Sequence, residues 1–155
     1  MAEISFKSVG EMANTDKFQA EANTLPIGIM TPLRLGTQSD GIFAMHFSVP
    51  GQIQDNLRNL LLTNKGERLG MYDFGANLRE LTMEHGSDAF DGAAVSRIKA
   101  AVDRYMPFVG LNTFASKAIP NLNGAIERVD VAITYDVPKL GLVGKEIVVT
   151  LFVRG

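Results

Sequence analysis

Two carboxylates, Glu67 and Asp73, lie close together in the sequence and are of a type that could carry out catalysis. Glycoside hydrolysis needs two such groups beside the bond that breaks, and burial must keep one of them protonated. Their spacing would allow both groups to face one cleft. However, a chain with 17 acidic residues offers such pairs by chance, and it contains no tryptophan on which a sugar could stack. We therefore expect a protein that is not an enzyme, with a hydrolase as the alternative.

Other enzyme-like patterns in the chain are incomplete. Asp73-Phe74-Gly75 matches the metal-binding triplet of protein kinases, but the glycine-rich loop and the catalytic loop that accompany it are absent. Segment 141–146 lacks both the glycine spacing and the hydroxyl residue after the lysine that a phosphate-binding loop needs. The chain has 2 histidines and no cysteine, so we expect neither a metal site nor a cofactor.

The composition is that of a protein with one compact core. The 155 residues are 46% apolar, and the formal net charge is only -2, which gives no general attraction to nucleic acid or to an anionic membrane. No segment approaches the ~20 apolar residues of a membrane helix, and the start lacks the features of a signal peptide. We expect a chain that is not exported and whose partners are proteins.

The chain is predicted to consist of an N-terminal arm, residues 1–41, and a single domain, residues 42–155. The arm is rich in Gly, Asn, Thr, Ser and Pro, and only 11–22 suggests a short helix. We expect this arm to be extended or to be ordered by a partner. The domain opens with an alternating apolar pattern over 42–49, which predicts a strand that Pro50 ends.

Three helices follow in the pattern. The first is predicted over 52–64, where Ile53, Leu57, Leu60 and Leu61 form one apolar stripe. A shorter helix is predicted over 76–84, and a longer one over 92–105 that Pro107 would end.

Strand patterns fill the rest of the chain, over 111–119, 127–137 and 146–153. The turn at 138–144 makes the last two strands an antiparallel hairpin. The sequence therefore predicts an α+β fold with two or three helices packed on a small antiparallel sheet and a C-terminal β-hairpin.

The last predicted strand is apolar on both faces. A strand at the edge of its own sheet would expose one of these faces and a row of unpaired backbone groups. Two interpretations stay open: a central strand covered on both sides, or a strand that pairs with another chain. The residues concerned are Ile147, Val148, Val149, Thr150, Leu151, Phe152 and Val153.

The stretch from Leu60 to Leu78 carries a specific motif of leucines, Thr, Gly-Glu-Arg and then Phe-Gly. It resembles the lysozyme-like baseplate wedge family of phage contractile tails, the sheath initiators, with relatives in the type VI secretion baseplate. The match is close over 53–81 and looser over 25–33 and the closing hairpin. The motif residues are Leu61, Thr63, Gly66, Glu67, Arg68, Phe74 and Gly75.

These motif residues have structural roles in our interpretation. Gly66 can adopt a positive φ where a left-handed helix terminus is expected. Arg68, with five donors in a fixed geometry, could tie the turn to a neighbouring carboxylate or carbonyl. From the residues alone, Glu67 and Arg68 could equally be solvated charges at a helix end.

The family resembled here carries Glu-Pro-Arg after its long helix, on a surface that contacts the helical bundle of neighbouring wedge subunits. The aligned residues of this chain are Met106, Pro107 and Phe108. Only the proline is kept, so a hydrophobic contact by Met106 and Phe108 would have to replace the charged one. Alternatively, both side chains enter the core at a corner between helix and strand.

The resemblance implies a structural subunit of a phage contractile tail baseplate. Such a subunit would join the inner baseplate to the wedges and offer its closing hairpin as the first docking platform for the tail sheath. The residues themselves suggest the mechanism: the strands over 127–137 and 146–153 would pair with a strand of the first sheath subunit, through residues 147–153. Its partners would be the tail sheath protein, wedge subunits, and tail tube or inner baseplate proteins, without nucleic acid or membrane. It would lie in the virion, at the tail baseplate, after assembly in the host cytoplasm. The alternatives are a baseplate-associated lysozyme-like glycoside hydrolase and a type VI secretion baseplate subunit.

Overall fold

The computed structural model describes residues 25–37, 41–82, 90–120 and 126–152. The chain divides into two compact units, residues 1–49 and residues 50–155. The helix predicted over 11–22 lies outside the described residues, as does most of the predicted arm. Within the described segments, no helix has the length and apolar character that crossing a bilayer requires.

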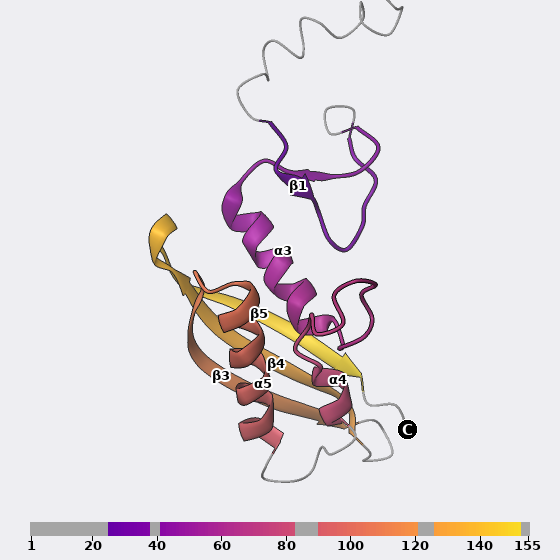
Figure 1. Cartoon of the computed structure of the whole chain (residues 1–155), viewed down its shortest axis with the longest axis vertical. Helices are drawn as coiled ribbons and strands as arrows, with labels where there is room; N and C mark the ends of the chain where they lie inside the picture. Colours follow the sequence, from indigo (N-terminus) through magenta and orange to yellow (C-terminus); the bar gives the residue numbers. More distant parts are fainter. Residues whose placement is uncertain (1–24, 38–40, 83–89, 121–125, 153–155) are drawn as a thin grey trace, which may run out of the picture. The chain divides into compact units, whose positions relative to one another are not determined.

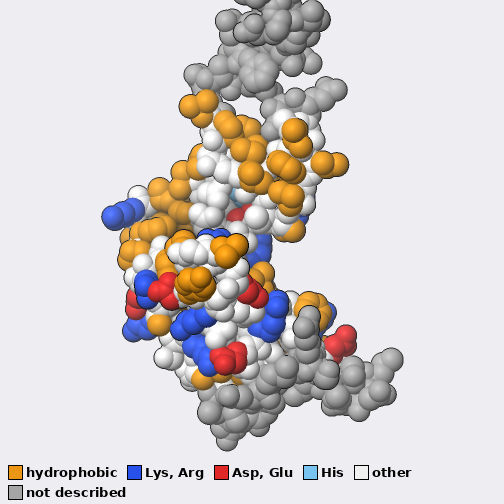
Figure 2. Space-filling model, turned by 45° about the vertical axis from the view of Figure 1, so that its right-hand side comes forward, with side chains coloured by type: hydrophobic (Ala, Val, Ile, Leu, Met, Phe, Trp, Pro, Cys, Tyr) orange, Lys and Arg blue, Asp and Glu red, His pale blue; other side chains and the backbone are white. Residues whose placement is uncertain are grey.

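The described part of the first unit is a small antiparallel ribbon. Strand β1 (Gly28–Ile29) pairs with β2 (Met45–His46), and an isolated bridge joins Leu35 to Phe43. The strand predicted over 42–49 is confirmed at Met45–His46 and as a bridge at Phe43, but it is shorter than predicted, and helix α3 already begins at Val49. Figure 2 shows hydrophobic side chains gathered on the surface of this segment. The exposed ones include Leu25, Ile27, Ile29, Leu33, Leu35 and Ile42.

Helix α3 (Val49–Leu62) carries the predicted apolar stripe, and its four members are buried. It begins earlier than predicted, since Pro50 and Gly51 lie in its first turn. Proline is tolerated there because the first N–H groups of a helix have no partner within it. The helix ends at Leu62, two residues before the predicted end.

Two further helices follow, α4 (Leu78–Leu81) and α5 (Phe90–Tyr105). Helix α4 is shorter than the predicted 76–84, whose last two residues lie outside the described residues. Helix α5 confirms the prediction over 92–105 and starts two residues earlier.

The sheet of the second unit has three antiparallel strands in the order β3-β4-β5. They are β3 (Gly110–Pro120), β4 (Ile126–Val137) and β5 (Leu142–Phe152). The predicted C-terminal hairpin is confirmed, with a 3-10 turn at Pro138–Leu140 between β4 and β5. The helices lie on one face of this sheet (Figure 1), so the α+β fold class is confirmed.

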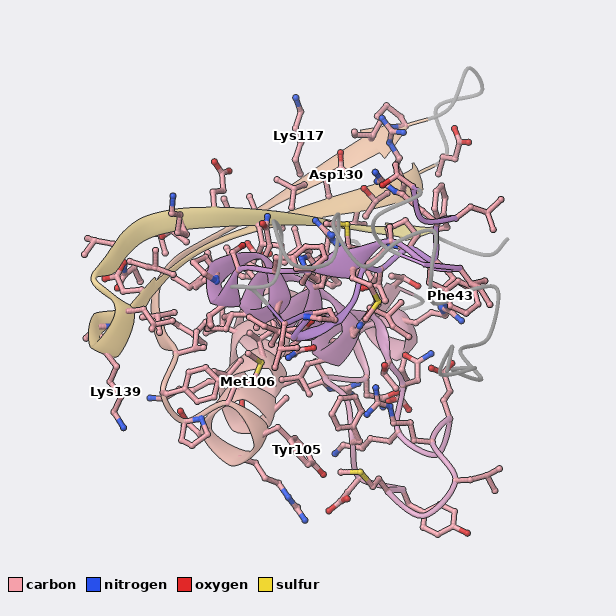
Figure 3. The ribbon with its side chains drawn as sticks, turned by 90° about the horizontal axis from the view of Figure 1, so that it is seen from above. Phe43, Tyr105, Met106, Lys117, Asp130 and Lys139 are labelled. Atoms are coloured by element: carbon pink, nitrogen blue, oxygen red, sulfur yellow. The ribbon has the colours of Figure 1, made fainter. Side chains whose placement is uncertain are left out.

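The core lies between the inner face of the sheet and the helices. Alternate residues of β4 and β5 are buried there, among them Val131, Ile133, Ile147 and Val149. Lys117 and Asp130 lie on the opposite face, away from the helices (Figure 3). This single covered face explains the alternating pattern in β4.

Strand β5 lies at the edge of this sheet. Among the described residues its ladder runs to β4 alone. The interpretation of a central strand covered on both sides is therefore wrong. The pattern misled because Val148 and Phe152 are apolar but point to the uncovered face, where 51% and 63% of their surface is exposed.

Candidate functional site

The motif segment forms a loop that leaves α3 and returns to it. The Thr63 hydroxyl donates a hydrogen bond to the Asn59 carbonyl oxygen at 2.6 Å, which continues the last turn of the helix. Further on, the Ala76 N–H donates to the Leu60 carbonyl oxygen at 3.0 Å. The loop between Thr63 and Ala76 is thus anchored at both ends on the same helix.

Gly66 closes the inner part of this loop. Its φ is +87°, as predicted, and its N–H donates to the Tyr72 carbonyl oxygen at 2.7 Å. It lies four residues beyond the end of α3, so it shapes the loop and does not cap the helix.

Gly75 is placed where no other residue fits. Its φ is +112°, and a Cβ built on it would lie 2.1 Å from the Thr63 carbonyl oxygen. The second half of the loop can therefore pack against its first half only through this glycine. The resemblance marks Gly75 as a motif residue, and this close approach gives the physical reason.

Glu67 braces the loop. Its carboxylate accepts hydrogen bonds from the Asn64 backbone N–H at 2.8 Å and from the Asn64 side chain at 2.9 Å. Arg79 lies 3.8 Å from it. The Asn64 backbone and side-chain bonds hold the pKa of Glu67 below its ordinary value, because they favour the charged form.

Asp73 has a different set of partners, at the end of α5. It accepts a hydrogen bond from the Tyr105 hydroxyl at 2.9 Å and forms an ion pair with Arg104. The Tyr105 bond is the main reason that the pKa of Asp73 is lowered. Both carboxylates thus have lowered pKa values, whereas the general acid of glycoside hydrolysis needs a raised one.

Arg68 does not act as predicted. Its guanidinium lies over the Phe74 ring, 3.8 Å from the ring centre. Phe74 in turn meets Tyr105 edge to face, with 5.0 Å between ring centres. Among the described residues, the guanidinium forms no ion pair with a carboxylate and no hydrogen bond with a carbonyl oxygen. The flat, weakly hydrated guanidinium stacks well on an aromatic ring, and this stacking takes the place of the predicted tie.

A pocket of about 270 Å³ brings the two predicted motif regions together. Met106 is only 5% exposed and belongs to the core, whereas Phe108 is 40% exposed. The core interpretation therefore fits Met106, and the surface interpretation fits Phe108. Tyr105 and Met106 both lie at the end of α5 in Figure 3. We call this the corner pocket; it is lined by Asn56, Asn59, Leu60, Arg68, Phe74, Tyr105, Met106 and Phe108.

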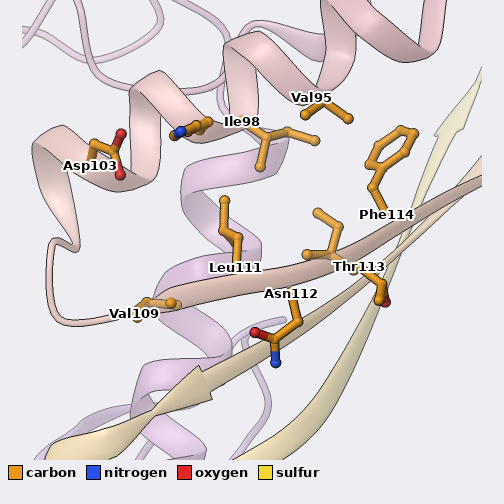
Figure 4. A pocket seen from close by; sticks show the side chains of 11 residues that line it. Val95, Ile98, Asp103, Val109, Leu111, Asn112, Thr113 and Phe114 are labelled. Carbon is orange, nitrogen blue, oxygen red and sulfur yellow. The ribbon is translucent and has the colours of Figure 1, made fainter.

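A second hollow of about 280 Å³ lies between α5 and the start of β3 (Figure 4). Ile98 from the helix and Leu111 and Phe114 from the strand line it. Its lining is mostly apolar. The hollow lies where α5 approaches the β3 edge of the sheet. No local sequence pattern marks these residues as a site.

Comparison with known proteins finds likeness in structure. Neither a family model nor a curated protein matches the chain. A candidate tail lysozyme from Geobacter sulfurreducens is 20% identical with a TM-score of 0.58, over 70% of this chain and 94% of that one. A chain of the anti-feeding prophage baseplate is 16% identical with a TM-score of 0.55, over 86% and 90%. The likeness is one of fold.

The sequence found most of the residues in the corner pocket but not their grouping. The motif residues Arg68 and Phe74 and the corner residue Phe108 were singled out separately. Tyr105, which joins them, enters the prediction only as the last residue of the helix over 92–105. Its hydrogen bond to Asp73 spans 32 residues, and no local pattern reveals such a contact.

Proposed function

We propose that this chain is a structural subunit of a contractile tail baseplate and that it starts sheath assembly by strand pairing. The proposal rests on the sequence motif and on the fold that the chain shares with a chain of the anti-feeding prophage baseplate. The single observation that carries the strand-pairing step is the outer edge of β5, which no described strand covers.

Strand pairing suits this edge for two reasons. The β5 register on β4 runs without a shift from Arg128↔Phe152 to Tyr135↔Lys145, so the strand is regular over this length. Each backbone hydrogen bond that an added strand gains would contribute roughly 1 kcal/mol net. Burial of Val148 and Phe152 beside the new strand would add about 25 cal/mol per Å².

The corner pocket is the proposed contact with the wedge subunits. Pro107 and Phe108 are exposed there, so the hydrophobic contact that replaces the family's charged one would come from Phe108. In this proposal one subunit contacts the wedge subunits at its corner and the sheath at its β5 edge.

We propose a non-catalytic role because Glu67 and Asp73 are both occupied by structural partners and both have lowered pKa values. The name of the Geobacter neighbour keeps the hydrolase as the alternative. The same contacts would serve in a secretion-system baseplate. Capsid and terminase genes beside this gene would decide in favour of a phage.

Electron microscopy of particles made without the gene tests the proposal. The deletion is complemented by the wild-type chain or by the double variant Glu67→Gln, Asp73→Asn. We expect tails without sheath or baseplate on deletion, and both chains to restore them. Intact tails on deletion, together with a defect in cell-wall digestion that only the wild type repairs, would favour the hydrolase.

A further inference from the structure

The guanidinium of Arg68 is held in place but carries an unused charge. It stacks on Phe74 at 3.8 Å, and among the described residues no carboxylate lies within ion-pair distance of it. Two other arginines of the second unit form ion pairs: Arg58 with Asp55 at 3.1 Å and Arg97 with Glu80 at 2.8 Å. Arg68 is thus positioned at the corner pocket with its donors available.

The charges around the pocket favour an anion. Asp73 is the nearby carboxylate on the same aromatic cluster, but it is already shared by the Tyr105 hydroxyl and Arg104. Lys65 also acts on Asp73 and lowers its pKa. Two cations, Arg104 and Lys65, therefore oppose the charge of Asp73. The residues that line the pocket include Arg68 but no carboxylate, so the pocket favours an acidic group.

The size and lining of the pocket favour a single side chain. Its volume of about 270 Å³ is below that of most small-molecule sites, which begin near roughly 300 Å³. Leu60 and Met106 are buried beneath it, and Phe108 offers a partly exposed apolar ring. A glutamate fits this combination, because its methylene groups can pack on Phe108 while its carboxylate meets Arg68.

We propose that the corner pocket binds an acidic side chain of a neighbouring baseplate protein, with Arg68 as the residue that recognises the carboxylate. Stacking on Phe74 leaves the guanidinium edge free to donate two parallel hydrogen bonds. The identity of the partner rests on the proposed function, whereas the chemistry of the site rests on the pocket itself. Recognition by Arg68 would let the corner pocket select its partner by charge, which the uncharged residues Met106, Pro107 and Phe108 alone could not do.

A pair of peptide probes tests the chemistry. The probes are N-acetyl-Leu-Glu-Leu-amide and the same peptide with Gln in place of Glu, titrated into the full chain and followed by NMR. We expect the Glu peptide to bind about tenfold more tightly than the Gln peptide and to shift the Arg68 side-chain Nε–H signal. Arg68→Gln should remove this preference, while Lys117→Gln, which removes the same charge from the outer face of the sheet, should keep it.

Two results would overturn the proposal: no preference between the peptides in the wild type, or a preference that survives Arg68→Gln. A circular dichroism melt of each variant shows whether it is folded. Arg68→Lys provides a second test, because it keeps the charge but loses the planar fork. It should show a preference weaker than the wild type and stronger than Arg68→Gln, and an undiminished preference would contradict recognition by the fork.

Particle assembly separates this proposal from the proposed function. Arg68→Glu in the deletion strain should give fewer complete baseplates than the wild-type chain. If deletion abolishes tails but Arg68→Glu assembles normally and the peptides show no preference, the pocket proposal fails alone. If the peptides show the preference but deletion leaves tails intact, the proposed baseplate function fails alone.

Discussion

The two edges of the three-stranded sheet differ in how well they are protected against pairing. Edge β3 has register shifts at both ends, between Leu111 and Thr113 and between Ile119 and Pro120. Edge β5 has one register shift, between the pairs Val137↔Leu142 and Tyr135↔Lys145, and then runs regularly to Phe152. Bulges, lysine and proline are common means by which proteins block an exposed edge. Strand β3 has a register shift at each end, Lys117 in its middle and Pro120 as its last residue. Strand β5 has one register shift and Lys145 near its start.

The outward side chains show the same difference. On the uncovered face, β5 presents Val148 and Phe152 with more than half of each exposed, beside Glu146 and Thr150. The same face of β3 carries Thr113, Ala115, Lys117 and Ile119, and the apolar Ile119 is only partly exposed. A monomer that needed protection from strand addition would be expected to guard both edges. We infer that β3 is closed to pairing and that β5 is kept open for a partner.

The largest expected effect comes from making β5 resemble β3. Val148→Lys with Phe152→Lys places charges beside the proposed partner strand, so sheathed tails should fall about tenfold or more, which corresponds to a loss of about 1.4 kcal/mol or more. Negative-stain counts of sheathed tails measure the effect. The matched control is Ala115→Lys with Thr113→Lys on β3. Equal damage from both pairs, or normal tails from the β5 pair, would remove the proposed difference between the edges.

A variant that destabilises the fold away from both edges shows whether stability alone explains such losses. Gly75→Ala forces a Cβ to within 2.1 Å of the Thr63 carbonyl oxygen at a φ of +112°. We expect a loss of about 2 to 4 kcal/mol in the free energy of unfolding, measured by urea denaturation.

The control for Gly75→Ala is Gly66→Ala. Gly66 also has a positive φ, but nothing lies within 4 Å of the position that a Cβ would take there, so the expected loss is only about 1 kcal/mol. Gly75 lies in the loop that carries the corner-pocket residues Arg68 and Phe74, so the number of tails can fall, but at a temperature where Gly75→Ala is folded the tails that do assemble should carry sheath. Missing sheath under these conditions would mean that the edge variants also act through stability.

Neighbouring residues of β5 should separate folding from assembly. Val149 is 2% exposed and Val148 is 51% exposed, so Val149→Ala should cost about 2 kcal/mol of stability. Val148→Ala should change stability by less than about 0.5 kcal/mol but reduce sheath attachment. Urea denaturation and counts of sheathed tails measure the two effects. A stability loss at Val148 equal to that at Val149 would contradict the placement of β5 with one uncovered face.

The smallest expected effect is a pH dependence that links the two edges through Asp136. Hydrogen bonds from the Asn112 side chain on β3, and then from the Gly144 N–H near the start of β5, hold the pKa of Asp136 below its ordinary 3.8. The ionised form therefore adds stability that is complete well above pH 3.8 and is lost as the pH falls through the lowered pKa. Asp136→Asn should flatten this part of the acid unfolding curve. An acid unfolding curve that is unchanged in Asp136→Asn would show that the hydrogen bonds of Asp136 to β3 and β5 do not stabilise the fold.

The sequence predicts those elements whose residues repeat with a clear period. The stripe of α3, the long helix α5 and the β4–β5 hairpin follow from such local patterns. The start of α3 was missed because Pro50 can begin a helix as well as end a strand. The strand over 42–49 was overestimated because alternation alone does not provide a pairing partner.

The site was less predictable because it depends on contacts between distant segments. The resemblance identified Arg68 and Phe74, but their stacking and their meeting with Tyr105 depend on how α5 packs beside the loop. The position of β5 at the edge depends on strand order, and its apolar pattern pointed equally to a central strand. Residue types thus indicated which positions matter, while the sheet topology decided what they can do.

Site-specific crosslinking from the two edges tests the strand-pairing account most directly. The chain has no cysteine, so Val148→Cys on β5 and Lys117→Cys on β3 each provide a unique site for a benzophenone label. The labelled chains are assembled into tails and irradiated, and the crosslinked partners are identified by mass spectrometry. We predict that the β5 label attaches to the sheath protein and that the β3 label does not. A sheath crosslink from β3 alone, or none from β5 in sheathed tails, would contradict docking of the sheath on the β5 edge.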